Sequence, residues 1–405
     1  MPKPEEYCIF ASRNLRHGSN TTKHDVMAKK NNKQQNPFVL AEYAGPEYFC
    51  DRTEETEELI ANLQNGRNTT LISPRRIGKT GLIRNAFYRI RKAEKEAVCI
   101  YIDIYSTKNQ HDFVQVLGTA IAQYVLTFEE QALKRLLQFF GSWRPVFSVD
   151  PLTGMPTVSV SIEAVQTEMT LRTIFDYLKQ SRHNIYIAID EFQQIAYYPE
   201  TGTEALLRSY MQFAPNVHFV FSGSKQHLMA QIFNSPNRPF YQSTTGMSLY
   251  PLHEEIYYDF ARNFFEARKG TLSKEIFHTI YTRFNGITAN IQQILNRLYE
   301  QDKTVSEERQ VTEAIQHIVN RSSMQYEGLV LFLTDNQLSL LKAIAKADCV
   351  KSPQSNEFIK TYELPSASSV KTALTVLVDK DLVYHDARGY TVYDRFFDLW
   401  LKQLV

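Results

Sequence analysis

The sequence predicts an α/β fold of three layers with a mostly parallel sheet, followed by a helical segment and a small C-terminal unit. Short apolar strands alternate with amphipathic helices between residues 37 and 252, which is typical of a parallel sheet covered on both faces. From about residue 334 onward, three helical patterns are followed by two short β-rich runs. These two patterns predict at least two domains.

Length and composition indicate an ordinary multidomain protein. The chain has 405 residues, of which 43% are apolar and 22% charged, and its formal net charge of +1 argues neither for nor against a polyanionic partner. The four cysteines lack CxxC spacing and the ten histidines are scattered, so neither disulfides nor a zinc site is expected. No run is apolar enough to span a membrane and no secretory signal is recognised, so we expect a cytoplasmic protein.

The elements of the first part follow from local patterns. Residues 1–36, rich in Asn, Lys, Gln and Ser, are expected to form a disordered leader, with Met27 as an alternative start. A β-rich stretch at about 143–162 predicts a hairpin insertion around a Pro-Leu-Thr-Gly turn. Strands are expected at 69–73, 98–105, 185–189, 217–222 and 247–252. Helices are expected at 53–64, 79–91 and about 111–128. A further helix is expected after residue 128 to about 140, and another at 169–181.

A loop that ends in Gly78-Lys79-Thr80 joins the strand at 69–73 to the next helix. Backbone N–H groups at a helix N-terminus bind phosphate oxygens, and Gly78 allows close approach of the main chain. Lys79 would bind the β- and γ-phosphates, and the Thr80 hydroxyl would ligate Mg²⁺. The loop thus predicts a P-loop for ATP and Mg²⁺, formed by Ser73, Pro74, Arg75, Arg76, Ile77, Gly78, Lys79, Thr80 and Gly81. Because the strict motif has glycine where this chain has Ser73, a chance Gly-Lys-Thr is the alternative.

Two carboxylates, Asp190 and Glu191, follow the apolar strand at 185–189. The carboxyl ends of parallel strands border the ligand crevice of an α/β sheet. Asp190 would hold Mg²⁺ there, and Glu191 would be the catalytic base that polarises the attacking water. Capping of the following helix is the alternative. Ser222 and Ser224, after the next strand, are catalytic candidates that could reach the γ-phosphate, or they form an ordinary polar turn.

Several segments carry a resemblance to a known family: FCDRTEE at 49–55, SPRRIGKT at 73–80, IAIDEFQQI at 187–195 and FVFSGS at 219–224. They resemble the archaeal-type P-loop ATPases of the STAND and AAA+ branches, from about residue 36 to the C-terminus. The resemblance implies a P-loop NTPase domain at 37–252, Walker A residues Lys79 and Thr80, and Walker B residues Asp190 and Glu191.

The same resemblance implies roles outside the Walker motifs. Phe49 and Arg52 would lie on the adenine side of the nucleotide, and Arg208 and Arg238 would sense phosphate or act as arginine fingers. For each of these last two arginines a structural salt bridge is an equal alternative. Residues 253–330 would form a helical lid, in which the family's Gly-x-Pro motif corresponds to 285–289 and lacks its proline.

The C-terminal residues 331–405 predict a winged helix: helices at 335–347 and 356–362, a third with Ser366 as its N-cap, and a hairpin at 382–385 and 390–393. Residues 335–405 contain nine Lys or Arg and nine Asp or Glu. Because phosphate contacts supply most non-specific DNA affinity, contact with a protein partner or autoinhibition is favoured over DNA binding.

The sequence therefore predicts an ATP-binding, ATP-hydrolysing P-loop ATPase that acts as a nucleotide-dependent switch, with a winged helix for contact with a partner. One alternative is an ATP-licensed DNA-binding regulator that uses Lys371 and Arg388. Another is a scaffold that binds nucleotide without hydrolysis, which Ser73 keeps open. An oligomer would follow if Arg208 or Arg238 acted on a neighbouring subunit.

Overall fold

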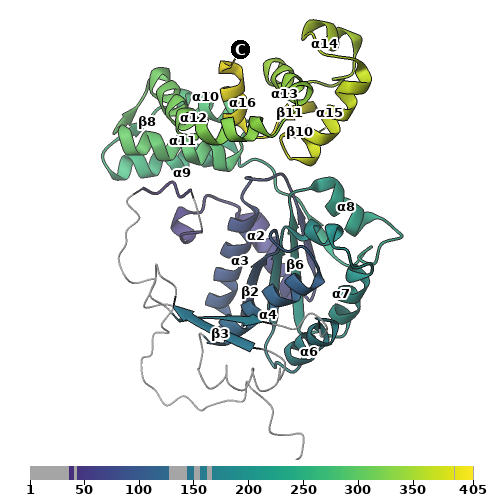
Figure 1. The fold of residues 1–405 in the computed structure, drawn as a ribbon. Coiled ribbons are helices and arrows are strands. Elements are labelled where there is room, and N and C mark those ends of the chain that lie inside the picture. Colours follow the sequence, from purple (N-terminus) through teal and green to yellow (C-terminus); the bar gives the residue numbers. More distant parts are fainter. Residues whose placement is uncertain are drawn as a thin grey trace, which may run out of the picture. The chain divides into compact units, whose positions relative to one another are not determined.

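The structure is a computed structural model that describes residues 36–40, 43–126, 144–149, 156–161, 167–386 and 388–404. The expected leader before residue 36 and the helix expected up to about residue 140 lie outside these ranges. The chain divides into two compact units (Figure 1). The first unit extends to Leu252 but excludes Asn36–Leu40; the second consists of Asn36–Leu40 and the residues from His253.

The first unit is built on a five-stranded sheet in the order β2-β5-β6-β1-β7. All neighbouring strands are parallel. The register pairs Asp103 with Asp190 and Ile72 with Gly223, so the polar residues that follow these strands meet at one edge of the sheet. The strands are β1 (Thr69–Ile72), β2 (Val98–Asp103), β5 (Ile185–Asp190), β6 (Val217–Gly223) and β7 (Thr245–Met247).

Helices cover both faces of this sheet (Figure 1). Because side chains alternate along a strand, Ile100, Ile187 and Phe219 face one core, which includes residues of α4 (Gln110–Leu126), α6 (Thr167–Lys179), α7 (Thr203–Gln212) and α8 (Gln226–Asn234). Helices α2 (Thr53–Gln64) and α3 (Lys79–Ala93) pack on β1 and β2. The three-layer fold with a parallel sheet, predicted from the alternation of strands and helices, is confirmed.

A hairpin of β3 (Arg144–Val149) and β4 (Pro156–Ser161) lies beside α4. The backbone N–H groups of Val158 and Val160 donate to the side chains of Gln123 (2.9 Å) and Thr119 (3.1 Å) on α4. Side chains of the helix thus satisfy backbone donors of β4 that would otherwise attract another strand. Of the hairpin expected at about 143–162, residues 144–149 and 156–161 do pair as antiparallel strands, whereas the expected Pro-Leu-Thr-Gly turn lies outside the described residues.

The last strand of the sheet differs from the expectation. The sequence predicted it at 247–252, whereas β7 spans Thr245–Met247. Pairing starts earlier because the Thr245 N–H donates to the carbonyl of Asn68 (2.8 Å). Pairing also ends earlier, and the Leu249 N–H is bound by the Ser73 hydroxyl (2.5 Å) instead of a neighbouring strand.

The second unit begins with helices α9 (Glu254–Ala267), α10 (Lys274–Arg283), α11 (Thr288–Gln301) and α12 (Glu308–Leu331). A parallel pair, β8 (Thr271–Leu272) with β9 (Thr304–Val305), was not predicted. Phe38 is fully buried, with its ring centroid 5.8 Å from that of Phe264 on α9 and 5.6 Å from that of Tyr299 on α11. The sequence had grouped this segment with the first unit, but its packing belongs to the second.

The winged-helix order is confirmed. Helices α13 (Asp335–Ala347), α14 (Asn356–Thr361) and α15 (Ala367–Asp379) precede an antiparallel hairpin of β10 (Val383–Asp386) and β11 (Gly389–Val392), and α16 (Arg395–Gln403) follows. The Ser366 hydroxyl accepts from the Ser369 N–H (3.3 Å), the predicted N-cap of α15. None of the described helices is long and apolar enough to cross a membrane.

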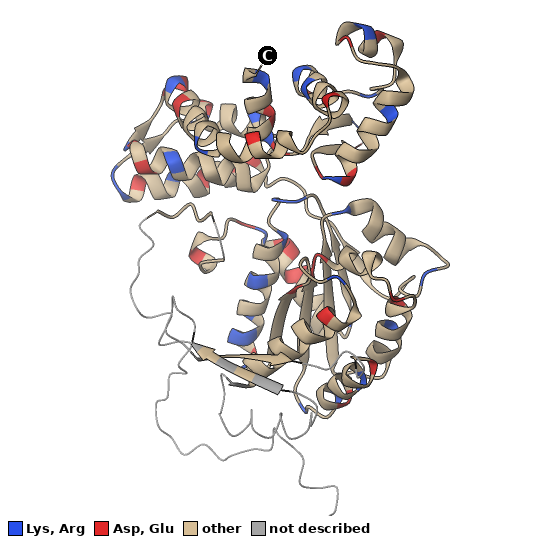
Figure 2. Ribbon diagram, in the orientation of Figure 1, with Lys and Arg blue, Asp and Glu red and all other residues tan. Residues whose placement is uncertain are grey.

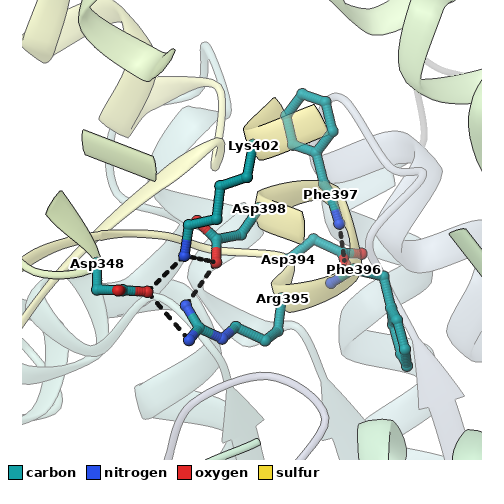
Figure 3. A network of polar contacts seen from close by, with 7 residues as sticks. All are labelled: Asp348, Asp394, Arg395, Phe396, Phe397, Asp398 and Lys402. Atoms are coloured by element: carbon teal, nitrogen blue, oxygen red, sulfur yellow. Dashed lines mark hydrogen bonds and ion pairs between the residues drawn. The ribbon is translucent and has the colours of Figure 1, made fainter. Parts of the chain in front are cut away.

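A charged network joins α16 to the end of α13 (Figure 3). Lys402 Nζ lies 2.5 Å from Asp348 Oδ1 and 3.2 Å from Asp398 Oδ2, and Arg395 contacts the same two carboxylates at 3.2 and 2.5 Å. Asp398 is only 1% exposed, so its charge depends on these two cations. Asp394 caps α16 by accepting from two backbone N–H groups of its first turn. The network therefore holds α16 against the winged-helix core.

Candidate functional site

The loop between β1 and α3 is curled by two residues in the left-handed region, Arg76 (φ 65°) and Gly78 (φ 105°). Gly78 adopts this conformation without the cost that a Cβ would impose. Helix α3 begins at Lys79, so the N–H groups of its first turn have no intrahelical acceptor. A curled loop in front of such a helix end is suited to bind an anion such as a phosphate.

Ser73, at the first position of the loop, has a structural contact of its own. Its side chain is 1% exposed, and its hydroxyl donates to the Ile72 carbonyl (2.7 Å) while accepting from the Leu249 N–H (2.5 Å). The hydroxyl therefore ties the end of β1 to the segment after β7.

Lys79 is held inside the loop. Its side chain is 7% exposed, and Nζ donates to the carbonyls of Ser73 (2.7 Å) and Pro74 (2.8 Å). Burial lowers the pKa of Lys79 to about 8; the carboxylates of Asp190 and Glu191 oppose this shift and Arg75 adds to it. A bound phosphate would supply the further negative charge that this partly desolvated ammonium lacks.

Asp190 ends β5 directly beside the start of α3. Its Oδ2 accepts from the Thr80 hydroxyl (2.8 Å) and the Tyr101 hydroxyl (2.6 Å), and its Oδ1 accepts from the Glu191 N–H (3.0 Å). The sequence did not single out Tyr101, whose ring lies 4.1 Å below the guanidinium of Arg84. Burial and the neighbouring Asp190 raise the pKa of Tyr101, so its hydroxyl stays a donor.

The pair of Thr80 and Asp190 fits Mg²⁺. A hydroxyl and a carboxylate are the hard oxygen ligands that this ion prefers, and it usually takes its remaining ligands from water and substrate phosphates. Among the described residues, no group of three or more His, Cys, Asp or Glu side chains is placed to hold a metal ion.

Glu191 has a left-handed backbone (φ 55°) and a carboxylate bound from two sides. Its Oε2 accepts from Gln193 Nε2 (2.5 Å) and from the Ser224 hydroxyl (2.9 Å). Ser224 in turn accepts from Arg75 Nε (3.1 Å), so a chain of polar contacts connects the phosphate loop to Glu191. Ser222 is fully buried, and its hydroxyl has no hydrogen-bond partner among the described residues.

Phe49 and Arg52 lie close to the phosphate loop. A Cβ at Gly81 would stand 3.0 Å from the Phe49 ring, so this glycine lets the ring pack on the first turn of α3. Arg52 is 4% exposed and donates to Glu55 (2.7 Å) and to the carbonyls of Ile77 (3.2 Å) and Tyr250 (2.6 Å). Arg52 therefore stabilises the loop through hydrogen bonds made from inside the fold.

The two arginines proposed as phosphate sensors have contacts on α7. Arg238 forms an ion pair with Glu204. With its amide oxygen turned toward Arg208, Gln212 one turn later accepts from both guanidinium Nη atoms (2.8 and 3.0 Å). For Arg238, the salt bridge that the sequence allowed as an alternative is the contact present in this structure.

Sequence reasoning missed Tyr101 and Gln193. Strand alternation places Tyr101 on the same face of β2 as Asp103, but its contact with Asp190 depends on β2 lying next to β5, which no local pattern reveals. Gln193 belongs to a short 3-10 helix, η4 (Phe192–Tyr197), and nothing in its neighbours indicates that its amide turns back to Glu191.

Two family models match parts of this chain. A family described as an ATPase domain predominantly from Archaea matches residues 49–294, more than half of the chain, and a probable winged helix domain matches 324–403. No curated protein matches the chain.

Solved structures show a similar fold over nearly the whole chain. A Walker-type ATPase of Pyrococcus abyssi has a TM-score of 0.62 at 16% identity, with 90% of this chain and 99% of that chain covered. The ORC2 protein of Aeropyrum pernix, solved as ADPNP and ADP complexes, gives 0.57 at 15%, with 92% and 98% covered. The ORC1 protein of the same organism, solved with DNA, gives 0.52 at 15%, with 91% and 96% covered. These likenesses concern the fold, and the family match over more than half of the chain shows that the chain belongs to the ATPase domain family found predominantly in Archaea.

Proposed function

We propose that the first unit binds ATP with Mg²⁺ and hydrolyses it to ADP and phosphate. The observation that carries the proposal is the contact of the Thr80 hydroxyl with Asp190 (2.8 Å), immediately before Glu191. It brings the start of α3, which includes Lys79, to the acidic end of β5. Membership of an ATPase family supports the same conclusion.

Each residue has a distinct task in this proposal. The loop from Ser73 to Gly81 and the ammonium of Lys79 bind the phosphates, and Thr80 and Asp190 hold the metal ion. Mg²⁺ would neutralise charge that develops on the phosphate oxygens. Glu191 takes a proton from the attacking water, whose oxygen forms a bond to the γ-phosphorus while the bond from γ-phosphorus to the bridging oxygen breaks.

The nucleotide-dependent switch is the second part of the proposal. One chain carries both an ATPase unit and a winged helix, and hydrolysis is a suitable signal to change how the second unit meets a protein partner. Adenine-side contacts of Phe49 are part of this proposal, as is a role for Ser222 or Ser224 near the γ-phosphate. The polar contacts of Arg52 and Arg238 within the fold favour structural roles for these two arginines.

DNA contact is a second candidate function, favoured by the winged helix and by the fold likeness to the ORC1 protein solved with DNA. The charge distribution of the second unit favours DNA contact less, because Lys and Arg are interspersed with Asp and Glu along this unit (Figure 2). Lys380 donates to the Phe332 carbonyl (3.0 Å), and Arg388 pairs with Asp386 (2.8 Å). Both side chains therefore already have polar contacts within the fold, which compete with contacts to DNA phosphates.

ATP turnover and nucleotide binding by the full chain test the main proposal, with Lys79→Ala and Glu191→Gln measured beside the wild type. We expect Lys79→Ala to lose nucleotide binding and Glu191→Gln to bind ATP with turnover reduced by ~10²–10⁴-fold, the usual contribution of a general base. Rapid turnover in Glu191→Gln would refute the assignment of the base. A folded wild type that binds no ATP in the presence of Mg²⁺ would refute the site itself.

Binding to a duplex DNA at several salt concentrations, with and without ATP, tests the second candidate. Binding that weakens with salt and is lost in Lys371→Glu with Arg388→Glu would support DNA contact. No binding at low salt in either nucleotide state would leave the protein-contact role as the better account.

A further inference from the structure

The side-chain amide of Gln193 is one of two groups that donate a hydrogen bond to the carboxylate of Glu191. Gln193 Nε2 and the Ser224 hydroxyl both donate to Glu191 Oε2, at 2.5 and 2.9 Å. Both donors bind the same oxygen, so they fix the rotation of the carboxylate and leave Oε1 as the oxygen available to a water molecule. None of the roles assigned above uses Gln193.

Gln193 is held by packing more firmly than an ordinary surface amide. It is 2% exposed and lies in η4, which its neighbour Phe192 anchors with a ring centroid 4.5 Å from that of Phe221. A Cβ at Gly223 would stand 2.4 Å from Gln193 Oε1 and 2.5 Å from Met229 Sδ. The absence of a side chain at Gly223, at the end of β6, therefore creates the space in which the amide lies.

The burial of this amide carries a cost in stability. Gln193 Oε1 is buried and has no hydrogen-bond partner among the described residues. A buried polar atom without a partner destabilises the fold, and an apolar side chain of the same size would avoid this. Among the described residues the amide donates to Glu191, so this contact offers a reason for a glutamine at this position.

We propose that Gln193 is a positioning residue that aims the carboxylate of Glu191 at the attacking water. The inference rests on the proposed function, in which Glu191 is the base. A base that is free to rotate spends less time in reach of the proton, and small misplacements of reacting groups cost up to ~10²-fold in rate. Loss of the amide should therefore lower kcat and leave ATP binding intact.

The chain offers a matched pair of substitutions. Gln193→Met keeps the length of the side chain and removes the donor. Gln194→Met makes the same chemical change on the next residue of η4, whose Nε2 donates to the Thr107 carbonyl (2.9 Å) and not to Glu191. Both variants are compared with the wild type in ATP turnover, in KM for ATP and in thermal unfolding, using the full chain with Mg²⁺.

We expect Gln193→Met to lower kcat by ~10–100-fold with an unchanged KM, and Gln194→Met to match the wild type. In a Glu191→Gln background, Gln193→Met should cause no further loss, because the carboxylate it positions is gone. Gln193→Glu adds an independent readout: its turnover should recover as the pH falls, since the protonated acid can donate as the amide does. This variant also tests the inference should Gln193→Met fail to fold.

The outcomes separate the inference from the proposed function. Turnover in the wild type with an unchanged kcat in Gln193→Met, or equal losses in Gln193→Met and Gln194→Met, would overturn the positioning role alone. A wild type that binds ATP without any turnover would overturn hydrolysis, and the positioning role with it.

Discussion

Replacing Lys79 by methionine should make the nucleotide-free protein more stable near neutral pH and abolish ATP binding. Burial lowers the pKa of Lys79 to about 8 from 10.5, a difference of roughly 2.5 units that corresponds to about 3 kcal/mol of unfavourable burial of the charge. The variant leaves the carbonyls of Ser73 and Pro74 without their donor, at about 1 kcal/mol each. The net gain expected for the variant is about 1 kcal/mol.

The sign of the pH dependence follows from the direction of the shift. Between about pH 8 and about pH 10.5 the unfolded chain still carries the Lys79 proton that the native state has released, so wild-type stability rises with pH in this window. The advantage of Lys79→Met should therefore shrink by about 1.4 kcal/mol per pH unit above about pH 8. With a starting advantage of about 1 kcal/mol, the order of stabilities should reverse near pH 9.

Urea unfolding followed by circular dichroism measures this effect. Comparing variant and wild type at the same pH cancels the titration of other groups, such as Tyr43, whose pKa burial raises to about 12. Lys95→Met is the matched control, because it makes the same chemical change at a lysine that is exposed to solvent. A stability difference for Lys79→Met that stays constant from about pH 7 to about pH 9.5 would refute the conclusion that burial lowers the pKa of Lys79.

Further changes test other contacts of the site. Tyr101→Phe should raise the Mg²⁺ concentration needed for half-maximal turnover by ~10-fold, because outer-shell donors orient ligating carboxylates; an unchanged Mg²⁺ titration would argue against this. Ser73→Gly should destabilise the fold by ~1–3 kcal/mol by leaving the Leu249 N–H unpaired, without tighter ATP binding; an unaltered melting temperature would contradict that role. Arg238→Gln and Glu204→Gln should lower stability non-additively in a double-mutant cycle, whereas additive losses would show that the pair is uncoupled.

Local patterns were enough to predict most elements of the fold. The apolar runs of β2, β5 and β6 between polar flanks mark a parallel sheet, and the periodicity of α13 and α15 with the hairpin after them marks the winged helix. The two-residue strands β8 and β9 were missed because periodicity needs more residues to appear. Phe38 was assigned to the wrong unit because its partners, Phe264 and Tyr299, are far away in sequence.

The site could be predicted only where the chemistry is local. Lys79 and Thr80 stand next to each other at a helix start, and Asp190 and Glu191 close an apolar strand, so local sequence patterns made them candidates. The contacts that organise these groups come from other strands or from a turn. Tyr101 reaches Asp190 across the sheet, and Gln193 reaches Glu191 by a backbone that folds back on itself.

The serine at position 73 raises the question whether the phosphate loop between β1 and α3 still supports ATP hydrolysis. A strict phosphate-loop motif has glycine at its first position, and the serine there kept open a scaffold that binds nucleotide without hydrolysis. Glycine is required where φ is positive or where a Cβ would obstruct the chain. Gly78 has φ 105°, whereas Ser73 is not among the described residues with positive φ. The Ser73 hydroxyl is turned to Ile72 and Leu249, and its carbonyl accepts from Lys79. The serine therefore fits the loop without distorting it, and the case for a non-hydrolysing scaffold has to come from Glu191 and its neighbours instead.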